Sequence, residues 1–469
     1  MAGLESPSAG AALSAKKVAV VGAGWSGLTA AVSACEAGHR VSVFEASRSL
    51  GGRARGLSDN DLYAAVGESV PMDNGQHILI GAYRQTLEIM RTVGINPEDV
   101  LLRQPLRLQF PGGDGMALPD WPEPWNFLVG VLWVKGWSWS DKLSLLGAVR
   151  QWKRKGFQCE TFATVADLCA GINTEVVESL LTPLCISALN TPPNSASGSI
   201  FLRVLQETLT ASPGSGSITN PPHPSDLLLP KVDLSALFPN VAAEWLRANG
   251  ASVHLGARCE APRWSAGKWH ILDQAFDAVI WATSATHAVQ ALSDYAQTAP
   301  TNVATYLNRW LKPARAIPYQ AIATVYAFAP GLQLPHPMLA LRSSPQAPAQ
   351  FVFDRGQLGG PEGVLAFVVS ASIGSREELQ NQVLEQAHIQ FEELLNGQTL
   401  TALQTVVEKQ ATFSCTPRLI RPPQRVAPGF LACGDYIYAP FPATLEGAVR
   451  SGMMAALALE EIDGFHWKP

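Results

Sequence analysis

Short apolar runs alternate along this chain with stretches of helical spacing. Four of these runs are continuous and rich in β-branched or aromatic residues, as in strands buried on both faces of a parallel sheet. They are Val18–Val21, Val41–Phe44, the start of Phe276–Val289, and Phe430–Cys433. After the first run, "LTAAVSACEAG" has small residues at helical spacing and ends at Gly38, a helix-stop signal. Because the runs come from both ends and the middle of the chain, we expect one sheet assembled from separated segments.

The pattern changes between these runs. Residues 80–224 carry helical spacing broken by prolines, whereas residues 320–372 predict an antiparallel sheet and residues 377–397 an amphipathic helix. "NGASVHLGARCEAPRW" (Asn249–Trp264) alternates like a pair of strands, and Ala211–Asp226 is a Gly/Ser/Pro loop. The predicted class is therefore α/β, with a second part that is helical and antiparallel.

These patterns also predict how the chain divides into domains. The predicted divisions are a disordered tail at 1–16, an α/β domain from 17–80, 225–300 and 405–469, and a second domain from 81–224 and 301–404.

Composition excludes several classes of protein. Hydrophobic residues make up 47% of the 469 positions and the net charge is −5, which does not favour nucleic-acid binding. The seven cysteines are odd in number and none is spaced as CxxC, which favours reduced thiols in the cytoplasm over a zinc site or disulfides. No metal site is expected. No apolar run reaches the length of a membrane-spanning helix, and the first residues do not resemble a secretory signal.

The strongest motif is "GAGWSG", which follows the first strand directly and opens a helix. In a G-x-G-x-x-G turn the first glycine permits the bend, the second lets the backbone approach a pyrophosphate and the third lets helix and strand pack closely. The helix N-terminus then offers free N–H groups to phosphate. An acid on the next strand is placed to accept hydrogen bonds from a ribose. The predicted dinucleotide contacts are Gly22, Gly24, Trp25, Ser26, Gly27 and Glu45.

The segment "LGGRARG" after that acid resembles the amine-oxidase and carotenoid-desaturase branch of flavoproteins. The resemblance implies non-covalent FAD in a Rossmann-like domain of the amine-oxidase and GDI type, discontinuous in sequence. It also implies that Gly52 and Arg53 lie at the FAD phosphates. Cys259 occupies a position whose backbone, in these families, pairs with the adenine.

"PGFLACGDYIYAPFPATLEGAVRSGMMAALALEEI" resembles the second half of the same flavin site. The resemblance places Gly434 and Asp435 at the ribityl-phosphate part of FAD. Thr444 and Leu445 open a helix whose N–H groups would stabilise negative charge on a reduced flavin. No second G-x-G-x-x-G lies between a strand and a helix, so a separate NAD(P)H domain is not expected.

Four longer stretches narrow the resemblance, which covers residues 17 to 456. They are Met72–Leu87, Pro183–Leu209, Ser225–Pro239 and Phe441–Gly452. Together they resemble the squalene-associated FAD-dependent desaturase-like proteins, described as hydroxysqualene dehydroxylases of bacterial hopanoid biosynthesis. The resemblance implies reduction of the C30 isoprenoid hydroxysqualene to squalene, with loss of water, by reduced FAD. It also implies an electron donor such as NAD(P)H.

The implied reaction needs an acid, a dry apolar channel and a flavin face aimed at an allylic carbon. "DNGQH" matches a stretch that lies beside the flavin ring in the wider superfamily, so Gly75 and Gln76 are expected at the cofactor. His77 is the first candidate for the acid, with Asp73 to orient it or to cap a turn, and Glu446 as another candidate. The reserve candidates are Asp354, Arg355 and Tyr438.

Two other readings remain open from the sequence. An isoprenoid desaturase would transfer hydride in the opposite direction on a similar lipid. A non-catalytic prenyl-lipid carrier of the GDI fold would not need the intact cofactor motifs seen here.

"WPEPWNFLVGVLWVKGWSW" (Trp121–Trp139) holds five of the 13 tryptophans. Tryptophan favours the membrane–water interface, and Lys135 and Lys153–Lys155 are placed to meet anionic headgroups. This stretch predicts either peripheral docking at the inner face of a bacterial membrane or burial within the second domain. The expected location is therefore cytoplasmic with peripheral membrane contact.

Overall fold

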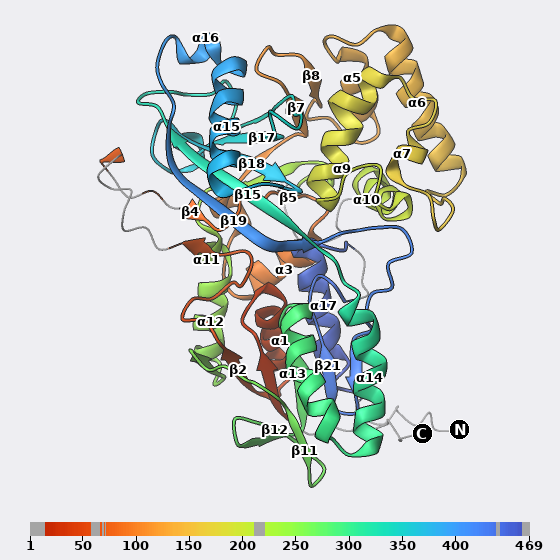
Figure 1. The fold of residues 1–469 in the computed structure, drawn as a ribbon, viewed down its shortest axis with the longest axis vertical. Helices are drawn as coiled ribbons and strands as arrows, with labels where there is room; N and C mark the ends of the chain where they lie inside the picture. Colours follow the sequence, from red (N-terminus) through yellow and green to blue (C-terminus); the bar gives the residue numbers. More distant parts are fainter. Residues whose placement is uncertain are drawn as a thin grey trace, which may run out of the picture.

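The computed structural model describes residues 15–57, 66–67, 70, 72–210, 221–437 and 441–461. The lower half of Figure 1 is built around a six-stranded sheet with strand order β10-β2-β1-β14-β21-β20. The strands are β1 (Lys17–Val21), β2 (Arg40–Glu45), β10 (Ser252–Leu255), β14 (Ala278–Trp281), β20 (Arg425–Ala427) and β21 (Phe430–Ala432). All pair in parallel except β20, which is antiparallel to β21. The predicted α/β class and the sheet of separated segments are confirmed.

Helices cover this sheet, and two of them bring the N-terminal and C-terminal parts of the chain into contact. They are α1 (Trp25–Glu36), α12 (Pro239–Ala248), α13 (Ala285–Thr298), α14 (Thr301–Arg315) and α17 (Leu445–Leu457). The N-terminal α1 and the C-terminal α17 pack closely, and at Gly452 a Cβ would overlap the carbonyl oxygen of Ser26. The small residues of both helices therefore allow the first and last parts of the chain to meet.

The upper half of Figure 1 contains a five-stranded sheet with strand order β16-β17-β18-β15-β19. Its strands are β15 (Tyr319–Phe328), β16 (Met338–Ala340), β17 (Phe351–Asp354), β18 (Val364–Ser370) and β19 (Thr401–Phe413), all antiparallel. One face packs on α15 (Arg376–Gln390) and α16 (Glu392–Leu395). Side chains of the other face line a cavity, because successive residues of a strand point to opposite faces.

A group of helices stands beside this sheet, at the upper right of Figure 1. They are α5 (Trp125–Trp133), α6 (Trp139–Arg154), α7 (Val165–Leu168), α8 (Thr174–Val176), the π-helical turn η1 (Val177–Leu181), α9 (Thr182–Leu189) and α10 (Gly198–Thr210). The remaining strands are β3 (Gly56–Leu57), β4 (Met72–Asp73), β5 (Leu79–Ile80), β6 (Leu101–Gln104), β7 (Arg107–Gln109), β8 (Gly115–Ala117), β9 (Leu227–Pro230), β11 (Arg263–Ser265), β12 (Lys268–Ile271) and β13 (Gln274–Phe276). The remaining helices are α3 (Arg84–Thr92), α4 (Pro97–Val100), α11 (Leu234–Leu237) and the 3₁₀ turn η2 (Gly356–Leu358).

The structure departs from the sequence predictions in one pairing. Asn249–Trp264 does contain two strands, but β10 joins the large parallel sheet and β11 joins a separate three-stranded sheet, so they do not pair with each other. Alternation predicts a strand but not its partner, which tertiary contacts decide.

Two elements differ from the predicted domain divisions: β19 crosses the boundary at residue 405, and α14, predicted in the second domain, packs with the first. β19 begins before residue 405 and is the edge strand of the upper sheet, while α14 packs against α13 and β20 of the lower half. The division by residue ranges remains a prediction. The contacts of these two elements favour β19 in the second domain and α14 in the first. Residues 1–14 of the predicted tail, and residues 211–220 of the predicted loop, lie outside the described residues.

Candidate active site

One large cavity of about 980 Å³ runs from the lower sheet into the space under the upper sheet. Its lower part is lined by the glycine turn after β1, the end of β2 and the segments that follow β14 and β21. Its upper part is lined by aliphatic and aromatic side chains from α5, α6, α9, α10 and the five-stranded sheet. A polar end and an apolar end therefore share one continuous space, of the size that holds a cofactor or ligand.

The glycine turn has room for a phosphate because side chains are missing. Gly22 has φ +105°, and a Cβ there would lie 2.8 Å from the carbonyl oxygen of Ala282. At Gly27 a Cβ would overlap the carbonyl oxygen of Gly22. At Gly24 it would have no neighbouring protein atom nearer than 3.9 Å, because this residue borders the cavity. The turn therefore presents bare backbone to the cavity.

The N-terminus of α1 points its free N–H groups at this space. Gly24 is the N-cap and supplies no side-chain acceptor. An anion is the natural partner for such uncapped N–H groups. Trp25 and Ser26 also line the cavity, and Trp25 Nε1 donates to the carbonyl of Ala54 at 2.9 Å, which fixes the following Gly-Gly-Arg segment.

Glu45 lies at the end of β2 and borders the same cavity. Its Oε2 accepts from the N–H of Ala23 and its Oε1 from the N–H of Ser47, both at 2.7 Å. A carboxylate has further lone pairs to accept ribose hydroxyls. Cys259 also lines the cavity near Glu45, and burial, with a smaller effect of Glu45, raises the pKa of its thiol to about 12. The residues predicted to bind the adenosine end are thus brought to one cavity from distant segments, and their roles toward the cofactor remain predictions.

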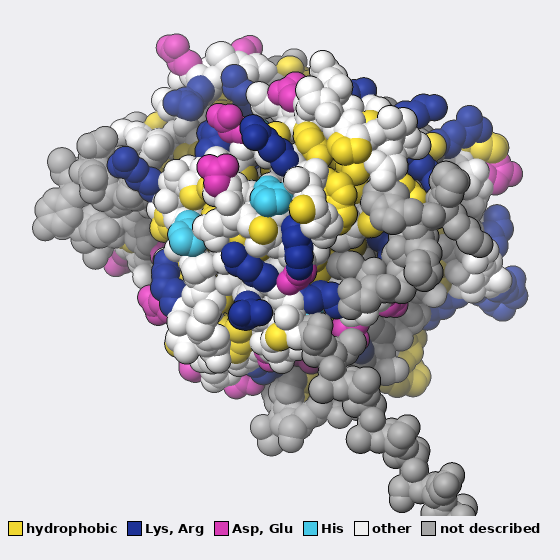
Figure 2. Space-filling view, turned by 90° about the horizontal axis from the view of Figure 1, so that it is seen from below, with side chains coloured by type: hydrophobic (Ala, Val, Ile, Leu, Met, Phe, Trp, Pro, Cys, Tyr) yellow, Lys and Arg dark blue, Asp and Glu magenta, His cyan; other side chains and the backbone are white. Residues whose placement is uncertain are grey.

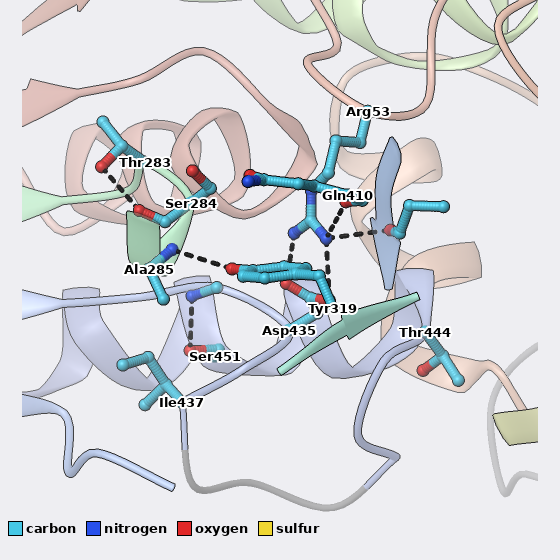
Figure 3. Close-up of polar contacts among 12 residues, drawn as sticks. Arg53, Thr283, Ser284, Ala285, Tyr319, Gln410, Asp435, Ile437, Thr444 and Ser451 are labelled. Atoms are coloured by element: carbon cyan, nitrogen blue, oxygen red, sulfur yellow. Dashed lines mark hydrogen bonds and ion pairs between the residues drawn. The ribbon is translucent and has the colours of Figure 1, made fainter. Parts of the chain in front are cut away.

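Arg53 and Asp435 form an ion pair that joins the two halves of the predicted site, 382 residues apart (Figure 3). Arg53 Nη1 also donates to the carbonyl of Ala411 on β19 at 2.9 Å. Burial opposes the charge of Arg53, but the charge and hydrogen bonds of Asp435 outweigh it and raise the pKa of the guanidinium. Both side chains line the cavity with Gly52. Their mutual contact was not predicted.

The turn after β21 and the start of α17 form the opposite wall. The N–H of Gly434 donates to Ser451 Oγ at 3.1 Å, which holds this turn on α17 (Figure 3). Thr444 is the N-cap of α17 and accepts from the N–H of Gly447 at 3.0 Å. Thr444 and Leu445 line the cavity, so the positive end of α17 faces it.

Glu446 is committed to structure. It is fully buried, and its carboxylate accepts from the N–H groups of Gln85 and Thr86, from Thr86 Oγ1 at 2.7 Å, and from Arg450 Nε at 2.7 Å. These groups include the uncapped N-terminus of α3, so Glu446 caps α3 from α17. It does not line the cavity. The geometry favours a structural role over the acid role considered from the sequence.

Glu446→Ala is expected to lower the free energy of unfolding by about 3 kcal/mol, because it leaves buried N–H groups and Arg450 without their acceptor. Thermal unfolding of the FAD-loaded protein measures this. Glu244→Ala, at an exposed position of α12, is the control and should change stability by less than about 0.5 kcal/mol. Equal melting temperatures for the two variants would contradict the capping role.

"DNGQH" brings four residues to the cavity wall, namely Asn74, Gly75, Gln76 and His77. His77 Nδ1 lies 2.7 Å from the carbonyl oxygen of Gly75, so that nitrogen donates. Burial lowers the pKa of His77 below 6.5, the Gly75 hydrogen bond raises it, and the charge of Arg53 lowers it further. Nε2 is then the nitrogen left for a ligand, and it donates only when the ring is protonated.

Asp73 does not orient His77 through any contact seen here. Its Oδ1 accepts from the N–H of Leu234 at 2.7 Å, and its own N–H and carbonyl meet the hydroxyl of Tyr326. Burial raises the pKa of this carboxyl to about 7, despite the Leu234 hydrogen bond and Arg355. Asp73 does not line the cavity, so it acts as a structural tie between segments.

The reserve candidates are also placed away from the cavity or outside the described residues. Asp354 accepts from the N–H of Leu334 at 2.9 Å and from Gln357 Nε2 at 2.8 Å. Arg355 is buried, with Nη1 3.4 Å from Gln76 Oε1, so it reaches the cavity only through Gln76. Tyr438 lies outside the described residues.

Sequence reasoning missed four carboxyl groups that line the cavity, namely Glu123, Glu260, Asp294 and Glu408. Glu123 is half-buried at the cavity wall, and its Oε1 lies 3.4 Å from Ser225 Oγ. Burial is the main cause that raises the pKa of Glu123. It is the single acid of Trp121–Trp139, which was the signal available in the sequence.

The fold and this cradle define a class of protein. A glycine turn with an uncapped helix, an acid on the next strand and a second helix N-terminus across the same cavity suit FAD, and the protein is an FAD-dependent oxidoreductase. The chain belongs to the family of flavin containing amine oxidoreductases, whose model matches residues 25–459.

Individual proteins that are similar to this chain support the same family. A hydroxysqualene dehydroxylase of Zymomonas mobilis is 26% identical over 93% of this chain and 97% of its own length. One of Rhodopseudomonas palustris is 29% identical over 94% and 97%. The crystal structure of an oxidoreductase from Methanosarcina mazei matches with a TM-score of 0.67 at 17% identity, over 94% of this chain and 99% of that one. The resemblance stated from the sequence is confirmed.

Proposed function

We propose that this protein reduces hydroxysqualene to squalene with loss of water. The observation that carries the proposal is the apolar end of the cavity, which is continuous with the residues predicted to hold FAD. The named activity of relatives that align over more than nine-tenths of the chain supports it. A long isoprenoid would bind at this apolar end, because burial of the apolar surface of the ligand against apolar side chains drives such binding.

Aliphatic and aromatic side chains dominate the upper cavity. They include Leu108, Leu118, Phe127, Leu145, Val149, Leu180, Leu184, Phe201, Leu205, Met338, Phe351 and Phe353. They come from α5, α6, η1, α9 and α10, from the hairpin of β7 and β8, and from the underside of the five-stranded sheet. Such a lining excludes water from a reacting carbon, as loss of a hydroxyl from an allylic carbon requires.

The reaction breaks the C–O bond of the alcohol, forms a C–H bond and releases water after the oxygen gains a proton. Bound FAD in its reduced form would supply the hydride, and an electron donor such as NAD(P)H would then reduce the flavin again. His77 is our candidate for the proton, because it lines the cavity with Arg53 and its Nε2 is not engaged by Gly75. Glu123 is the second candidate for the proton donor, because it lines the cavity and burial raises its pKa.

The direct test is anaerobic incubation of the FAD-loaded protein with dithionite and hydroxysqualene, followed by lipid analysis. Squalene is the expected product. A dehydrogenated product from squalene, formed with oxidised FAD, would instead identify a desaturase. Protein that neither retains nor rebinds FAD would favour a lipid carrier and overturn the proposal.

A further inference from the structure

The outer face of α5 and α6 carries a concentration of exposed apolar side chains. On α5 the exposed fractions are 62% for Trp125 and 64% for Trp133, and on α6 they are 70% for Trp139 and 65% for Leu143. We call this face, with Trp121 and Leu132, the tryptophan face. It combines several large side chains, whereas single exposed hydrophobic residues are ordinary on protein surfaces.

Contacts within the tryptophan face keep it in place. The rings of Trp121 and Trp133 pack edge to face, 5.9 Å apart. Lys142 Nζ donates to the carbonyl of Leu132 at 2.6 Å and lies over the ring of Trp139, which ties the end of α5 to the start of α6. At Gly130 a Cβ would overlap Leu118, so the opposite side of α5 packs closely on the protein. The exposed rings are therefore presented by a fixed pair of helices.

The same two helices form a wall of the cavity. Asn126 and Phe127 of α5, and Leu145, Val149 and Trp152 of α6, line it from the inside. One helix pair thus separates the cavity from the surface that carries the tryptophans. A lipid in a membrane at this face would therefore be separated from the cavity by α5 and α6.

Charge identifies the occupant of the tryptophan face. Residues 121–155 contain six lysines and arginines but only two acids, in a chain whose net charge is −5. Lys135, Arg150, Lys153, Arg154 and Lys155 are exposed there. The opposite end of the molecule, seen from below in Figure 2, mixes Lys and Arg with Asp and Glu. Tryptophan beside clustered cations matches an anionic bilayer surface.

The helices are suited to lie on a bilayer and not to cross it. α5 has nine residues, about 13 Å at 1.5 Å per residue, against a hydrocarbon core of about 30 Å. None of the helices within the described residues combines the length and apolar character that a membrane span needs.

We propose that the tryptophan face docks on the anionic surface of a phospholipid bilayer and that α5 and α6 form the entrance of the cavity. The docking does not depend on the proposed reaction. The entrance role rests on the proposed function, because it assumes a membrane-dissolved substrate.

Docking is tested with the FAD-loaded full chain and vesicles of phosphatidylglycerol mixed with phosphatidylcholine, measured by sedimentation without substrate. The unaltered protein is expected to bind. Trp125→Glu with Trp133→Glu is expected to weaken binding about tenfold or more, because both rings leave the interface. The matched control is Ile373→Glu with Ile389→Glu, two residues that are 88% and 70% exposed elsewhere, and it should bind like the unaltered protein.

A second pair of variants tests the charge. Arg154→Gln with Lys155→Gln should weaken binding to the anionic vesicles about fivefold for each charge, and should not change binding to pure phosphatidylcholine. Unchanged sedimentation of the double tryptophan variant would overturn docking. So would light scattering that shows a dimer which the same variant converts to a monomer, because the face would then bind a second copy.

Turnover separates the entrance role from the proposed reaction. The double tryptophan variant should lose turnover of hydroxysqualene in vesicles but keep it in detergent micelles. Equal turnover in both would overturn the entrance role. If the unaltered protein has no turnover in either, the proposed reaction fails while the vesicle result on docking still stands.

Discussion

Gly27→Ala is expected to yield protein that purifies without FAD. The added Cβ would overlap the carbonyl oxygen of Gly22 and lie 2.9 Å from Ala282 Cβ, so α1 would have to move away from β1 and β14. Overpacking of this kind costs about 1–3 kcal/mol in stability. The displacement falls at the turn that presents N–H groups to phosphate. We therefore expect a larger loss of FAD affinity than of folding stability. Flavin absorbance per protein measures the loss.

Gly147→Ala is the matched control for Gly27→Ala. Gly147 is also in a helix, but a Cβ there would have no atom within 4 Å. This variant should keep its full flavin content and gain slightly in stability, because alanine favours helix over glycine. If Gly27→Ala retained FAD to the same extent as Gly147→Ala, the cradle would not depend on the close approach seen here.

His77→Ala is expected to reduce turnover of hydroxysqualene by about 10²–10⁴-fold, with FAD still bound, if His77 donates the proton to the leaving oxygen. Only the protonated ring can donate from Nε2, since Nδ1 is engaged by Gly75. Burial, more than the charge of Arg53, holds the pKa of His77 below 6.5. Turnover of the unaltered protein should therefore rise as the pH falls toward that pKa, and the variant should lose this dependence.

Glu123→Gln discriminates the two candidates for the acid. It removes a proton donor and keeps the size of a side chain that also lines the cavity. If His77 is the acid, Glu123→Gln should keep turnover within about tenfold and retain the same pH dependence. A large loss in Glu123→Gln, together with full turnover in His77→Ala, would assign the proton to Glu123.

Local patterns could point to the residues of the glycine turn because the chemistry proposed for that turn resides largely in the backbone. A glycine turn, the strand before it and the helix after it are consecutive, so their geometry follows from local sterics. The cavity is lined by every predicted cofactor residue except Gly27, whose lack of a side chain instead lets α1 pack against the glycine turn. Their individual roles toward FAD remain predictions.

The roles of carboxylates could not be predicted in the same way. Glu446 and Asp73 stand in motifs next to the cavity, yet each is occupied by N–H groups from a distant segment, those of Thr86 and Leu234. Glu123 stands in an apolar stretch and lines the cavity. A carboxylate's function depends on what surrounds it, and burial and partners come from residues far away in sequence.

The sequence alone determined that this chain has an α/β sheet, binds FAD and resembles hydroxysqualene dehydroxylases, because strand periodicity and glycine spacing are properties of short segments. Only the tertiary structure decided that Arg53 pairs with Asp435, that β19 completes the upper sheet, and that α5 and α6 separate the cavity from an exposed tryptophan face. These features depend on contacts between segments tens to hundreds of residues apart. No local pattern encodes which of the possible partners a segment meets.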